Sequence, residues 1–390
     1  MTHGADAESE HEACEIEAGD RGIGRPKAEC REQTCAGERI VSRLGGAAAL
    51  ATTACICKAF LRPRGIRNAV DLLRIILAYC LGERGLRATA AWAAASGLAD
   101  ISNPAILYRL RHCGDWLTVL IGQLLTATTP TPARGRLIRL IDASTVTKPG
   151  PEAKKTNKLW RVHAAFDLPA ERFGHFELTD EHGGERVDRI PVVAGEIRIG
   201  DRCYLQPDRI AAVLDAGGDV LVRAGWRNAR WLDQQGEPLD LLAILSRAGE
   251  RLDRAVKIGR KSGAPLALRL IAVRKPDAVA ETARRQVRQQ GRKSGYTPSR
   301  QTLRAASWLI IVTSLPVDTF TTDDVLALYR LRWRIELGFK RLKSLVGLKN
   351  PPGIDDRSAK PWVLAHLLMI LLLEPLVDAL EDSPRWACAA

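Results

Sequence analysis

The sequence lacks any C-x2-C pair, and its nine cysteines are scattered at irregular spacings over 390 residues. An odd number of scattered cysteines argues against a disulfide framework, and the missing ligand spacing argues against a structural zinc site. We therefore expect reduced thiols in a cytoplasmic protein.

The sequence also lacks a long apolar segment and an N-terminal signal peptide. Its most apolar run, Val363–Leu373, contains His366 and is followed at once by Glu374 and Pro375. A helix needs about 20 apolar residues to cross a bilayer, so this run predicts a buried helix. The first twenty residues are acidic, which is not typical of a signal peptide. No membrane partner is expected.

Positive charge is absent from the N-terminal stretch. Residues 1–20 contain seven acids and no Lys or Arg, whereas the whole chain carries a net charge of +13. The rest of the chain therefore carries +20, so the basic excess belongs to the folded part. Such an excess indicates a polyanionic partner such as a nucleic acid.

The N-terminal third divides into a tail and a helical region. Residues 1–44 mix acids, Gly, Cys and Arg without periodicity, which predicts a disordered tail. Residues 45–130 have apolar positions at helical spacing, as in Asn68–Cys80, and predict an α-helical N-terminal domain. The segment Thr126–Arg136 is rich in Pro and Thr, which is typical of a linker.

Two short helices with a turn between them are predicted inside this helical domain. Leu86–Ala95 is rich in Ala, Gly97 provides a stop, and Ser102 caps a second helix that ends at Arg111. With Arg109 and Arg111 on the second helix, the arrangement resembles a helix-turn-helix reader of DNA. A plain helical bundle has the same pattern, so both interpretations stay open.

After the linker the apolar pattern changes to strand-like spacing. Five strands are predicted, at Leu137–Asp142, Arg161–Leu168, His175–Thr179, Ile197–Asp201 and Asp219–Ala224, with a helix at Pro207–Ala216 before the last. Three strands, then strand, helix and strand, then a later long helix is the element order of a ribonuclease-H-like fold. We predict an α/β chain whose ribonuclease-H-like core, a mixed sheet flanked by helices, has its first part at residues 131–224.

An insertion is predicted between the fifth strand and the later long helix. Residues 225–315 include two strand-like pieces, Leu266–Val273 and Trp308–Thr313, and a basic segment, Arg284–Arg300. We predict that they form a β-rich insertion that interrupts the core. Residues 316–390 then supply the second part of the core and the C-terminal helices.

The segment Leu328–Lys343 is the most informative part of the chain. Its polar residues at offsets 0, 3, 7 and 14 are Tyr329, Arg332, Glu336 and Lys343. On one continuous helix, which turns about 100° per residue, they share an arc of about 60°, with Lys340 beside it. An apolar stripe next to this arc predicts the buried face. One carboxylate in a basic frame suits metal-assisted chemistry on a phosphate backbone, and a solvated face with ordinary salt bridges is the alternative.

Two aspartates are predicted at strand ends. Asp142 ends the first predicted strand, and Asp201 ends the fourth. Ends of neighbouring strands meet at one edge of a sheet, where Glu336 on the closing helix could complete a set of three carboxylates. Such a set can hold two Mg²⁺ ions about 4 Å apart for phosphodiester chemistry. Spacing alone leaves a turn cap at Asp142 and a surface turn at Asp201 as alternatives.

The spacing Y-x2-R-x3-E-x6-K in this helix resembles the signature of the DDE transposases of the insertion-sequence-four type. Leu140–Ser144 (LIDAS) is similar to the family's first-aspartate segment, and Gly200–Tyr204 (GDRCY) is similar to its second. Cys203 stands at a position that is commonly glycine in the family, which puts the backbone after Asp201 in question. The similarity runs from about residue 45 to residue 375.

The resemblance implies a role for each motif residue. Asp142, Asp201 and Glu336 would be the catalytic acids and the ligands of two Mg²⁺ ions, for which Mn²⁺ can substitute. The residues that would contact DNA are Tyr329, Arg332, Lys340, Lys343, Arg202 and Trp308. In hairpin-forming relatives a tryptophan in the segment of Trp308 stacks on a flipped base, and a core tryptophan is the alternative.

The resemblance also implies a function, that of a DNA transposase which excises an insertion sequence by cut-and-paste chemistry and transfers its strands. Double-stranded DNA is the expected partner, both the terminal inverted repeats and the target, bound by a homodimer in a synaptic complex. The protein would then lie in the cytoplasm, at the bacterial nucleoid when bound to DNA. A decayed or domesticated transposase that only binds DNA, and a metal-dependent nuclease without strand transfer, are the alternatives.

Overall fold

A computed structural model describes residues 37–126, 135–150, 159–168, 170–348, 350–353 and 355–381. Most of the predicted tail (1–44) and of the predicted linker (Thr126–Arg136) lies outside these ranges. Residues 37–43 are helical, so the prediction of disorder is wrong for the end of the tail. The cause is a long-range contact, because Arg43 donates hydrogen bonds to the carbonyl oxygens of Leu371 and Leu372.

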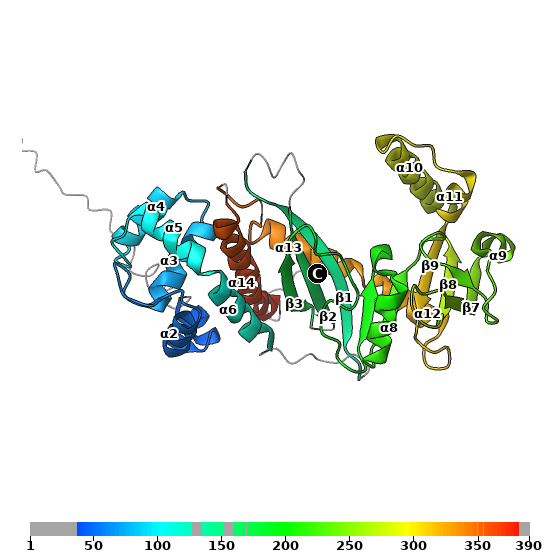
Figure 1. Ribbon diagram of the computed structural model, residues 1–390, viewed down its shortest axis with the longest axis horizontal. Helices are drawn as coiled ribbons and strands as arrows, with labels where there is room; N and C mark the ends of the chain where they lie inside the picture. Colours follow the sequence, from blue (N-terminus) through cyan, green and yellow to red (C-terminus); the bar gives the residue numbers. More distant parts are fainter. Residues whose placement is uncertain are drawn as a thin grey trace, which may run out of the picture.

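The N-terminal region is α-helical, as predicted (Figure 1). Its helices are α2 (Gly46–Ile56), α3 (Ala69–Leu81), α4 (Leu86–Ala95), α5 (Asn103–His112) and α6 (Gly114–Thr126). The Asn68 side chain caps α3, whereas Ser102 precedes α5 without making a capping hydrogen bond. Three of them, α3, α5 and α6, pack against α14 (Asp356–Glu381), in which the apolar run Val363–Leu373 is largely buried, as predicted. No described helix is long and apolar enough to span a membrane.

The two arginines of the predicted helix-turn-helix are partly engaged within the protein. Arg111 forms an ion pair with Asp355 at 2.6 Å, just before α14. Arg109 donates to the carbonyl oxygen of Arg62 at 3.3 Å and lies over the Phe60 ring. Arg111 therefore fastens α5 to α14, and both interpretations of this pair of helices remain open.

One mixed sheet of nine strands forms the centre of the molecule, in the order β3-β2-β1-β4-β5-β9-β8-β7-β6 (Figure 1). Its strands are β1 (Ile138–Thr147), β2 (Leu159–Leu168), β3 (Arg172–Thr179), β4 (Ile197–Gly200), β5 (Asp219–Arg223), β6 (Trp231–Leu232), β7 (Arg251–Ile258), β8 (Leu266–Arg274) and β9 (Trp308–Thr313). β1, β2 and β3 form an antiparallel meander, and β4 and β5 continue in parallel to β1, with α8 (Pro207–Asp215) between them. This architecture confirms the predicted ribonuclease-H-like α/β fold.

The strands of the predicted insertion belong to the same sheet as the core. β9 pairs with β5 on one side and with β8 on the other, so β8, β7 and β6 extend the sheet beyond β5. The sequence pattern did not predict the helices of residues 225–315, which are α9 (Leu241–Arg247), α10 (Asp277–Lys293) and α11 (Arg300–Ala305). α10 and α11 form a hairpin that stands away from the sheet (Figure 1).

A core lies on each face of the sheet. One joins the N-terminal helices, α14 and α13 (Trp333–Ser344) to the sheet, and the other lies beneath α8 and α9. α13 lies close to the sheet at Gly338, where an added Cβ would lie 2.9 Å from the Phe173 ring and 3.2 Å from the Phe166 ring. Glycine at this position therefore lets the helix that carries Glu336 pack directly on β2 and β3.

Buried histidines make the fold sensitive to acid. Burial lowers the pKa of His163, His175 and His366 to about 4, whereas an unfolded histidine has a pKa near 6.5. Between these values the unfolded chain binds more protons than the folded one. The free energy of unfolding is therefore expected to fall as the pH drops from about 6.5 to about 4.

The free energy of unfolding of His366→Leu is expected to fall by about 3 kcal/mol less than that of wild type over this pH range. The reason is that the substitution removes one of the histidines with a lowered pKa. Urea unfolding at a series of pH values measures the slope. His182→Leu, at an exposed histidine, is the control and should leave the slope unchanged. Equal slopes for wild type and His366→Leu would contradict the assignment.

Candidate active site

Asp142 lies on β1, and Asp201 directly follows the neighbouring parallel strand β4. β1 pairs with β4, and the last matched pair is Leu140 with Ile199. Asp142 and Asp201 each come two residues after this pair, so both lie where the pairing of β1 with β4 ends. Residues in register on parallel strands point to the same face of the sheet. The two predicted aspartates are therefore neighbours, as a shared site requires.

Asp142 lies in the middle of its strand, so the prediction that it ends the strand is wrong. β1 continues to Thr147, and Asp142 is paired with Ala164 of β2. β4 stops at Gly200, which leaves one edge of β1 uncovered from about Asp142 onward. β1 is long because it pairs along its whole length with β2. The edge of β1 that faces β4 has no strand partner beyond the end of β4.

Buried ion pairs support this register from the opposite face of the sheet. Arg139 of β1 and Arg198 of β4 are a matched pair. Arg139 binds Asp167 at 3.0 Å and Glu196 at 3.2 Å, and Arg198 binds Glu196 at 2.5 Å. Arg198 and Glu196 are fully buried, so a slip of the register would leave buried charges without partners, at a high cost.

The backbone after Asp201 forms a single 3₁₀ turn, η1 (Arg202–Tyr204). The Tyr204 ring is buried against Gly200, where an added Cβ would lie 3.0 to 3.1 Å from the ring and from the Tyr204 Cβ. Cys203 is not among the described non-glycine residues with positive φ. Cysteine in place of the family's usual glycine therefore needs no left-handed backbone here.

Asp201 carries an unsatisfied oxygen. Its Oδ1 atom is buried and has no hydrogen-bond partner, and the nearest cation is the guanidinium of Arg223, at 3.6 Å. Sequence reasoning missed Arg223, although it ends the strand next to β4. A buried carboxylate oxygen without a donor is costly unless a cation binds it, so Asp201 is suited to a metal ion.

The carboxyl group of Asp142 is a weaker acid than an exposed aspartate. Burial raises its pKa to about 6, and the nearby charges of Glu185 and Glu336 also raise it. The amide of Ala143, which donates to Oδ1 at 2.8 Å, and the charge of Arg332 act in the opposite direction. Glu185 was not predicted, and no motif marks it in the sequence. A bound cation would favour the ionised form of Asp142.

The predicted helix over Leu328–Lys343 is two helices. α12 (Thr322–Arg330) ends before α13 begins, and tight i→i+3 hydrogen bonds connect them, from Arg332 N to the Tyr329 carbonyl at 3.1 Å and from Arg334 N to the Leu331 carbonyl at 2.9 Å. The prediction of one straight helical face is therefore wrong. No Pro or Gly marks the break.

The break divides the signature residues between two parts of the site. Tyr329 is buried on α12, and burial together with the charge of Asp201 raises its pKa to about 12. Arg332 lies at the junction, where it shares a hydrogen bond with Tyr329 and an ion pair of 2.6 Å with Glu336. Arg332 thus connects the neighbourhood of Asp201 to that of Glu336.

A cleft of about 500 Å³ lies between β1 and α13. Its lining includes two acids, two lysines and a serine, namely Asp142, Glu336, Lys340, Lys343 and Ser144. Both lysines are exposed, as is Glu336, while the apolar stripe of α13 is buried, as predicted. The cleft therefore combines two of the three predicted acids with two of the predicted DNA-contacting lysines.

Arg202 and Trp308 lie together in a second cavity of about 540 Å³. Trp308 is half-buried at the start of β9, and Arg202 is exposed. Three further residues line this cavity, namely Arg223, Trp226 and Lys275. Sequence reasoning missed these residues because they come from different elements. Because Arg223 also forms an ion pair with Asp201, the second cavity adjoins this one of the three acids.

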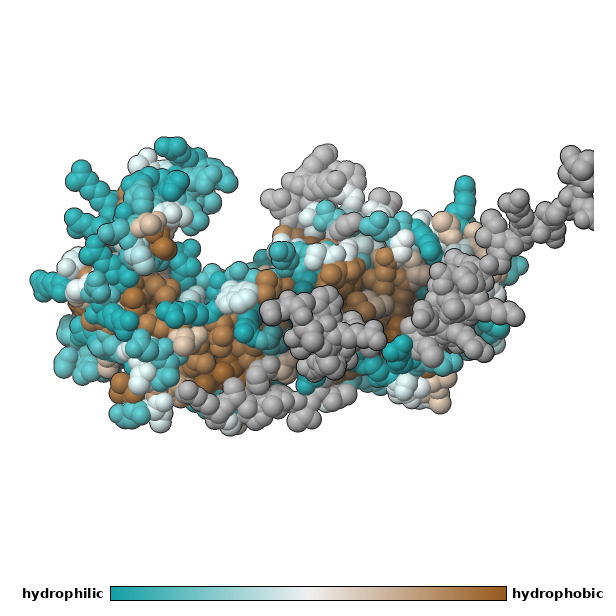
Figure 2. Space-filling model, turned by 180° about the vertical axis from the view of Figure 1, so that it is seen from behind, coloured by the Kyte–Doolittle hydropathy of each residue, from teal (hydrophilic) through white to brown (hydrophobic). Residues whose placement is uncertain are grey.

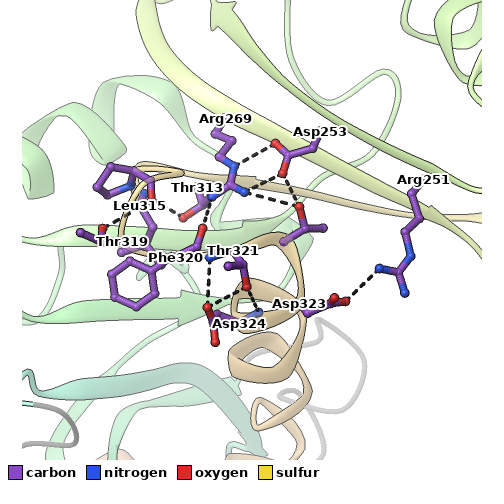
Figure 3. Close-up of polar contacts among 12 residues, drawn as sticks. Arg251, Asp253, Arg269, Thr313, Leu315, Thr319, Phe320, Thr321, Asp323 and Asp324 are labelled. Atoms are coloured by element: carbon purple, nitrogen blue, oxygen red, sulfur yellow. Dashed lines mark hydrogen bonds and ion pairs between the residues drawn. The ribbon is translucent and has the colours of Figure 1, made fainter.

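α12 is tied by its N-terminus to the strands of the insertion (Figure 3). Arg269 on β8 donates to both carboxylate oxygens of Asp253 on β7, at 2.8 and 2.6 Å, and to the carbonyl oxygen of Phe320 at 2.6 Å. The hydroxyl of Thr322, at the start of α12, also donates to Asp253. The insertion therefore fixes the helix that positions Tyr329.

Arg269→Ala is expected to lower the free energy of unfolding by about 2 kcal/mol, because it leaves the Phe320 carbonyl without this donor and Asp253 with only the Thr322 hydroxyl. Arg251→Ala is the control, since the ion pair of Arg251 with Asp323 is solvent-exposed on both sides and should contribute less than about 0.5 kcal/mol. Urea unfolding of both variants measures the difference, and equal losses would contradict this account.

The residues of the site fit a divalent cation in kind. They supply carboxylate oxygens, the donors that Mg²⁺ prefers, and the Oδ1 atom of Asp201 accepts no hydrogen bond. Among the described residues, however, no three His, Cys, Asp or Glu side chains are close enough together to hold a metal ion as the chain stands. The ion pair with Arg332 turns Glu336 toward the guanidinium, so a cation would compete with Arg332 for this carboxylate.

Comparison with known proteins shows the family of this chain. Residues 133–372, which contain all three acids, match the family model described as transposase DDE domain. The chain is 36% identical over 354 residues to the putative transposase InsL for insertion sequence element IS186A of Escherichia coli K12, covering 88% of this chain and 95% of the relative. It is also 36% identical over 355 residues, with the same coverage, to the transposase for insertion sequence element IS421 of Escherichia coli.

The family model covers more than half of the chain, and the relatives match it over nearly their whole length. Fold, acids and signature agree with the same family. The chain therefore belongs to the DDE transposases of the insertion-sequence-four type, enzymes that cleave DNA and transfer its strands.

Proposed function

We propose that this transposase moves an insertion sequence by cut-and-paste excision, with Asp142, Asp201 and Glu336 as its catalytic acids. The observation that supports the proposal is the parallel pairing of β1 with β4, since Asp142 and Asp201 both follow the last matched pair by two residues. Glu336 lines the same cleft as Asp142. The unsatisfied Oδ1 of Asp201 supports a role as a cation ligand.

The three carboxylates would hold two Mg²⁺ ions, or Mn²⁺ in their place. When bound, these ions would supply the Lewis acidity that a weak hydroxyl nucleophile and a leaving oxygen require. Asp142 must lose its proton to act as a ligand, and its raised pKa means that cation and proton compete for it near pH 6. Arg332, freed from Glu336, can grip a phosphate with its planar fork.

The basic residues around the acids would hold the DNA. Lys340 and Lys343 project into the cleft as flexible point charges for phosphates. Tyr329 orients Arg332 through a hydrogen bond. Because its raised pKa keeps the phenol protonated, the Tyr329 hydroxyl can also donate a hydrogen bond to a phosphate oxygen. In the second cavity, Arg202 would contact the backbone and Trp308 would stack on a base that leaves the helix at the cut.

The partners would be the inverted-repeat ends of the element and target DNA. Two ends must be held together, so a homodimer with one active site for each end is the proposed assembly. Excision and strand transfer would take place on chromosomal DNA, so the proposed location of the protein is the bacterial nucleoid in the cytoplasm.

Cleavage of a labelled duplex that carries the ends bordering this gene tests the proposal, with Mg²⁺ or Mn²⁺, for wild type and Glu336→Ala. Nicks at the end boundary by the wild type alone, followed by joining to a target duplex, are expected. Binding of the ends without cleavage by either protein would instead identify a decayed DNA-binding derivative. Cuts at random positions without joining would identify a general nuclease.

A further inference from the structure

The α10 helix turns one of its sides toward the second cavity. Four residues at offsets 0, 3, 4 and 7 line the cavity and share this side, namely Ala283, Gln286, Val287 and Gln290. Both glutamines are exposed, so neither belongs to a packed core. Among the described residues, none forms a hydrogen bond with the Gln286 side chain, and the Gln290 side chain reaches only the Ser294 hydroxyl, at 3.5 Å. Two amide groups therefore line the cavity with most of their hydrogen-bonding capacity unused.

Contacts at the foot of the α10–α11 hairpin hold this side of α10 close to Trp308. Arg284 on α10 donates to the hydroxyl of Ser307, the residue before Trp308, at 2.7 Å. Just before α10, the backbone amide of Lys275 donates to the Ser307 carbonyl oxygen and its ammonium donates to the Ala306 carbonyl oxygen, both at 2.8 Å. Seen from behind, the hairpin rises from one end of the body with a largely hydrophilic surface (Figure 2). These contacts therefore fix the place of the two glutamines relative to Trp308.

The second cavity has the size and the composition of a nucleotide pocket. Its volume of about 540 Å³ lies within the range of about 300 to 1,000 Å³ that is typical of small-ligand sites. Trp226 and Trp308 both line it, and the guanidinium of Arg227 lies over the Trp226 ring, 4.1 Å from the ring centroid. The described residues of its lining include three arginines and a lysine but no acid. Aromatic rings, amides and cations are the groups with which proteins bind the face, the edge and the phosphate of an unstacked nucleotide.

We propose that Gln286 and Gln290 select the base that enters the second cavity, by hydrogen bonding to the edge of that base. The proposal rests on the proposed function, in which a base leaves the helix at the cut and stacks on Trp308. Stacking alone accepts any base, because every base has an aromatic face. A glutamine amide offers both donors and an acceptor, so it can match the edge of one base better than the edges of the others. The two glutamines would therefore give the site a preference for the base at one position of the element end.

Single-turnover cleavage of end duplexes by the full-length chain tests this selection. In a first panel of duplexes, one base is missing from each, at successive positions around the cut. Trp308→Ala should cleave the intact duplex more slowly than wild type, and the abasic duplex that restores its rate identifies the position of the selected base. A second panel carries each of the four bases at that position. Gln286→Leu and Gln290→Leu each remove one amide, and Gln289→Leu is the matched control, because Gln289 is exposed on the same helix but does not line the cavity.

Wild type is expected to cleave the duplex with its preferred base about tenfold faster than the duplexes with the other three bases. Each glutamine variant should reduce this preference to about threefold or less, whereas Gln289→Leu should keep it. The loss of rate in the glutamine variants should be confined to duplexes that carry a base, because the abasic duplex offers no edge to bind.

Three results would overturn the selection by glutamine and leave end cleavage by this transposase intact. They are a wild type without a preferred base, glutamine variants with the full preference, and glutamine variants that lose as much rate on the abasic duplex as on the intact one. If no abasic duplex restores the rate of Trp308→Ala, the stacking on Trp308 is refuted and the selection with it. Wild type that does not cleave at the element ends would overturn both this proposal and the proposed function.

Discussion

Asp201→Asn is expected to slow cleavage at the element end by at least about a thousandfold, while binding of the end duplex persists. Asparagine keeps the shape of the side chain but loses its charge, so Oδ1 can no longer serve as an anionic ligand. Bound cations would stabilise the transition state by several kcal/mol. Each reduction of the activation free energy by about 1.4 kcal/mol corresponds to a factor of ten in rate. Single-turnover cleavage with Mg²⁺ and calorimetric titration of Mn²⁺ without DNA measure the two effects.

Asp215→Asn is the matched control, since it makes the same change at an exposed aspartate at the end of α8. This variant should cleave and bind Mn²⁺ as wild type does. Cleavage by Asp201→Asn within tenfold of wild type, roughly, or an unchanged Mn²⁺ isotherm, would remove Asp201 from the catalytic set.

The three acids were predicted chiefly from the resemblance of their segments to the family's motifs, and their local surroundings agree with that prediction. Asp201 follows a short strand and precedes a tight turn, and Glu336 lies beside a regular apolar stripe on α13. These are short-range patterns of hydrophobicity and residue type. The ribonuclease-H-like order of elements followed from the same patterns, and the comparisons and the sheet topology confirm it.

The features that the sequence did not reveal depend on contacts between distant residues. The break between α12 and α13 occurs without a helix-breaking residue, where the chain passes from the insertion strands to the core sheet. The ion pair of Arg223 with Asp201 depends on how β4 and β5 align. The place of Asp142 inside β1 depends on β2 being longer than β4. None of these leaves a periodic signal in the chain.

The ion pair of Arg332 with Glu336 suggests how the site is kept in order before DNA and cations arrive. Glu336 is half-exposed, and without a partner it would be free to rotate away from the cleft. Arg332 holds it at 2.6 Å and is itself oriented by Tyr329, which the insertion fixes through α12. A phosphate that draws Arg332 away would release Glu336 for cation binding. Substrate binding and assembly of the acids would then be coupled through one guanidinium.

Arg332→Gln is therefore expected to lower the cleavage rate by about a hundredfold, because it removes both the phosphate fork and the group that orients Glu336. Arg332→Lys keeps the charge without the fork and should recover about a tenth of wild-type activity. Single-turnover cleavage of the end duplex measures both variants. Arg330→Gln, at the exposed neighbouring arginine that ends α12, is the control and should cleave as wild type does. Equal losses of cleavage rate for Arg330→Gln and Arg332→Gln would mean that Arg332 contributes only its positive charge. That result would refute the proposed coupling between phosphate binding and Glu336.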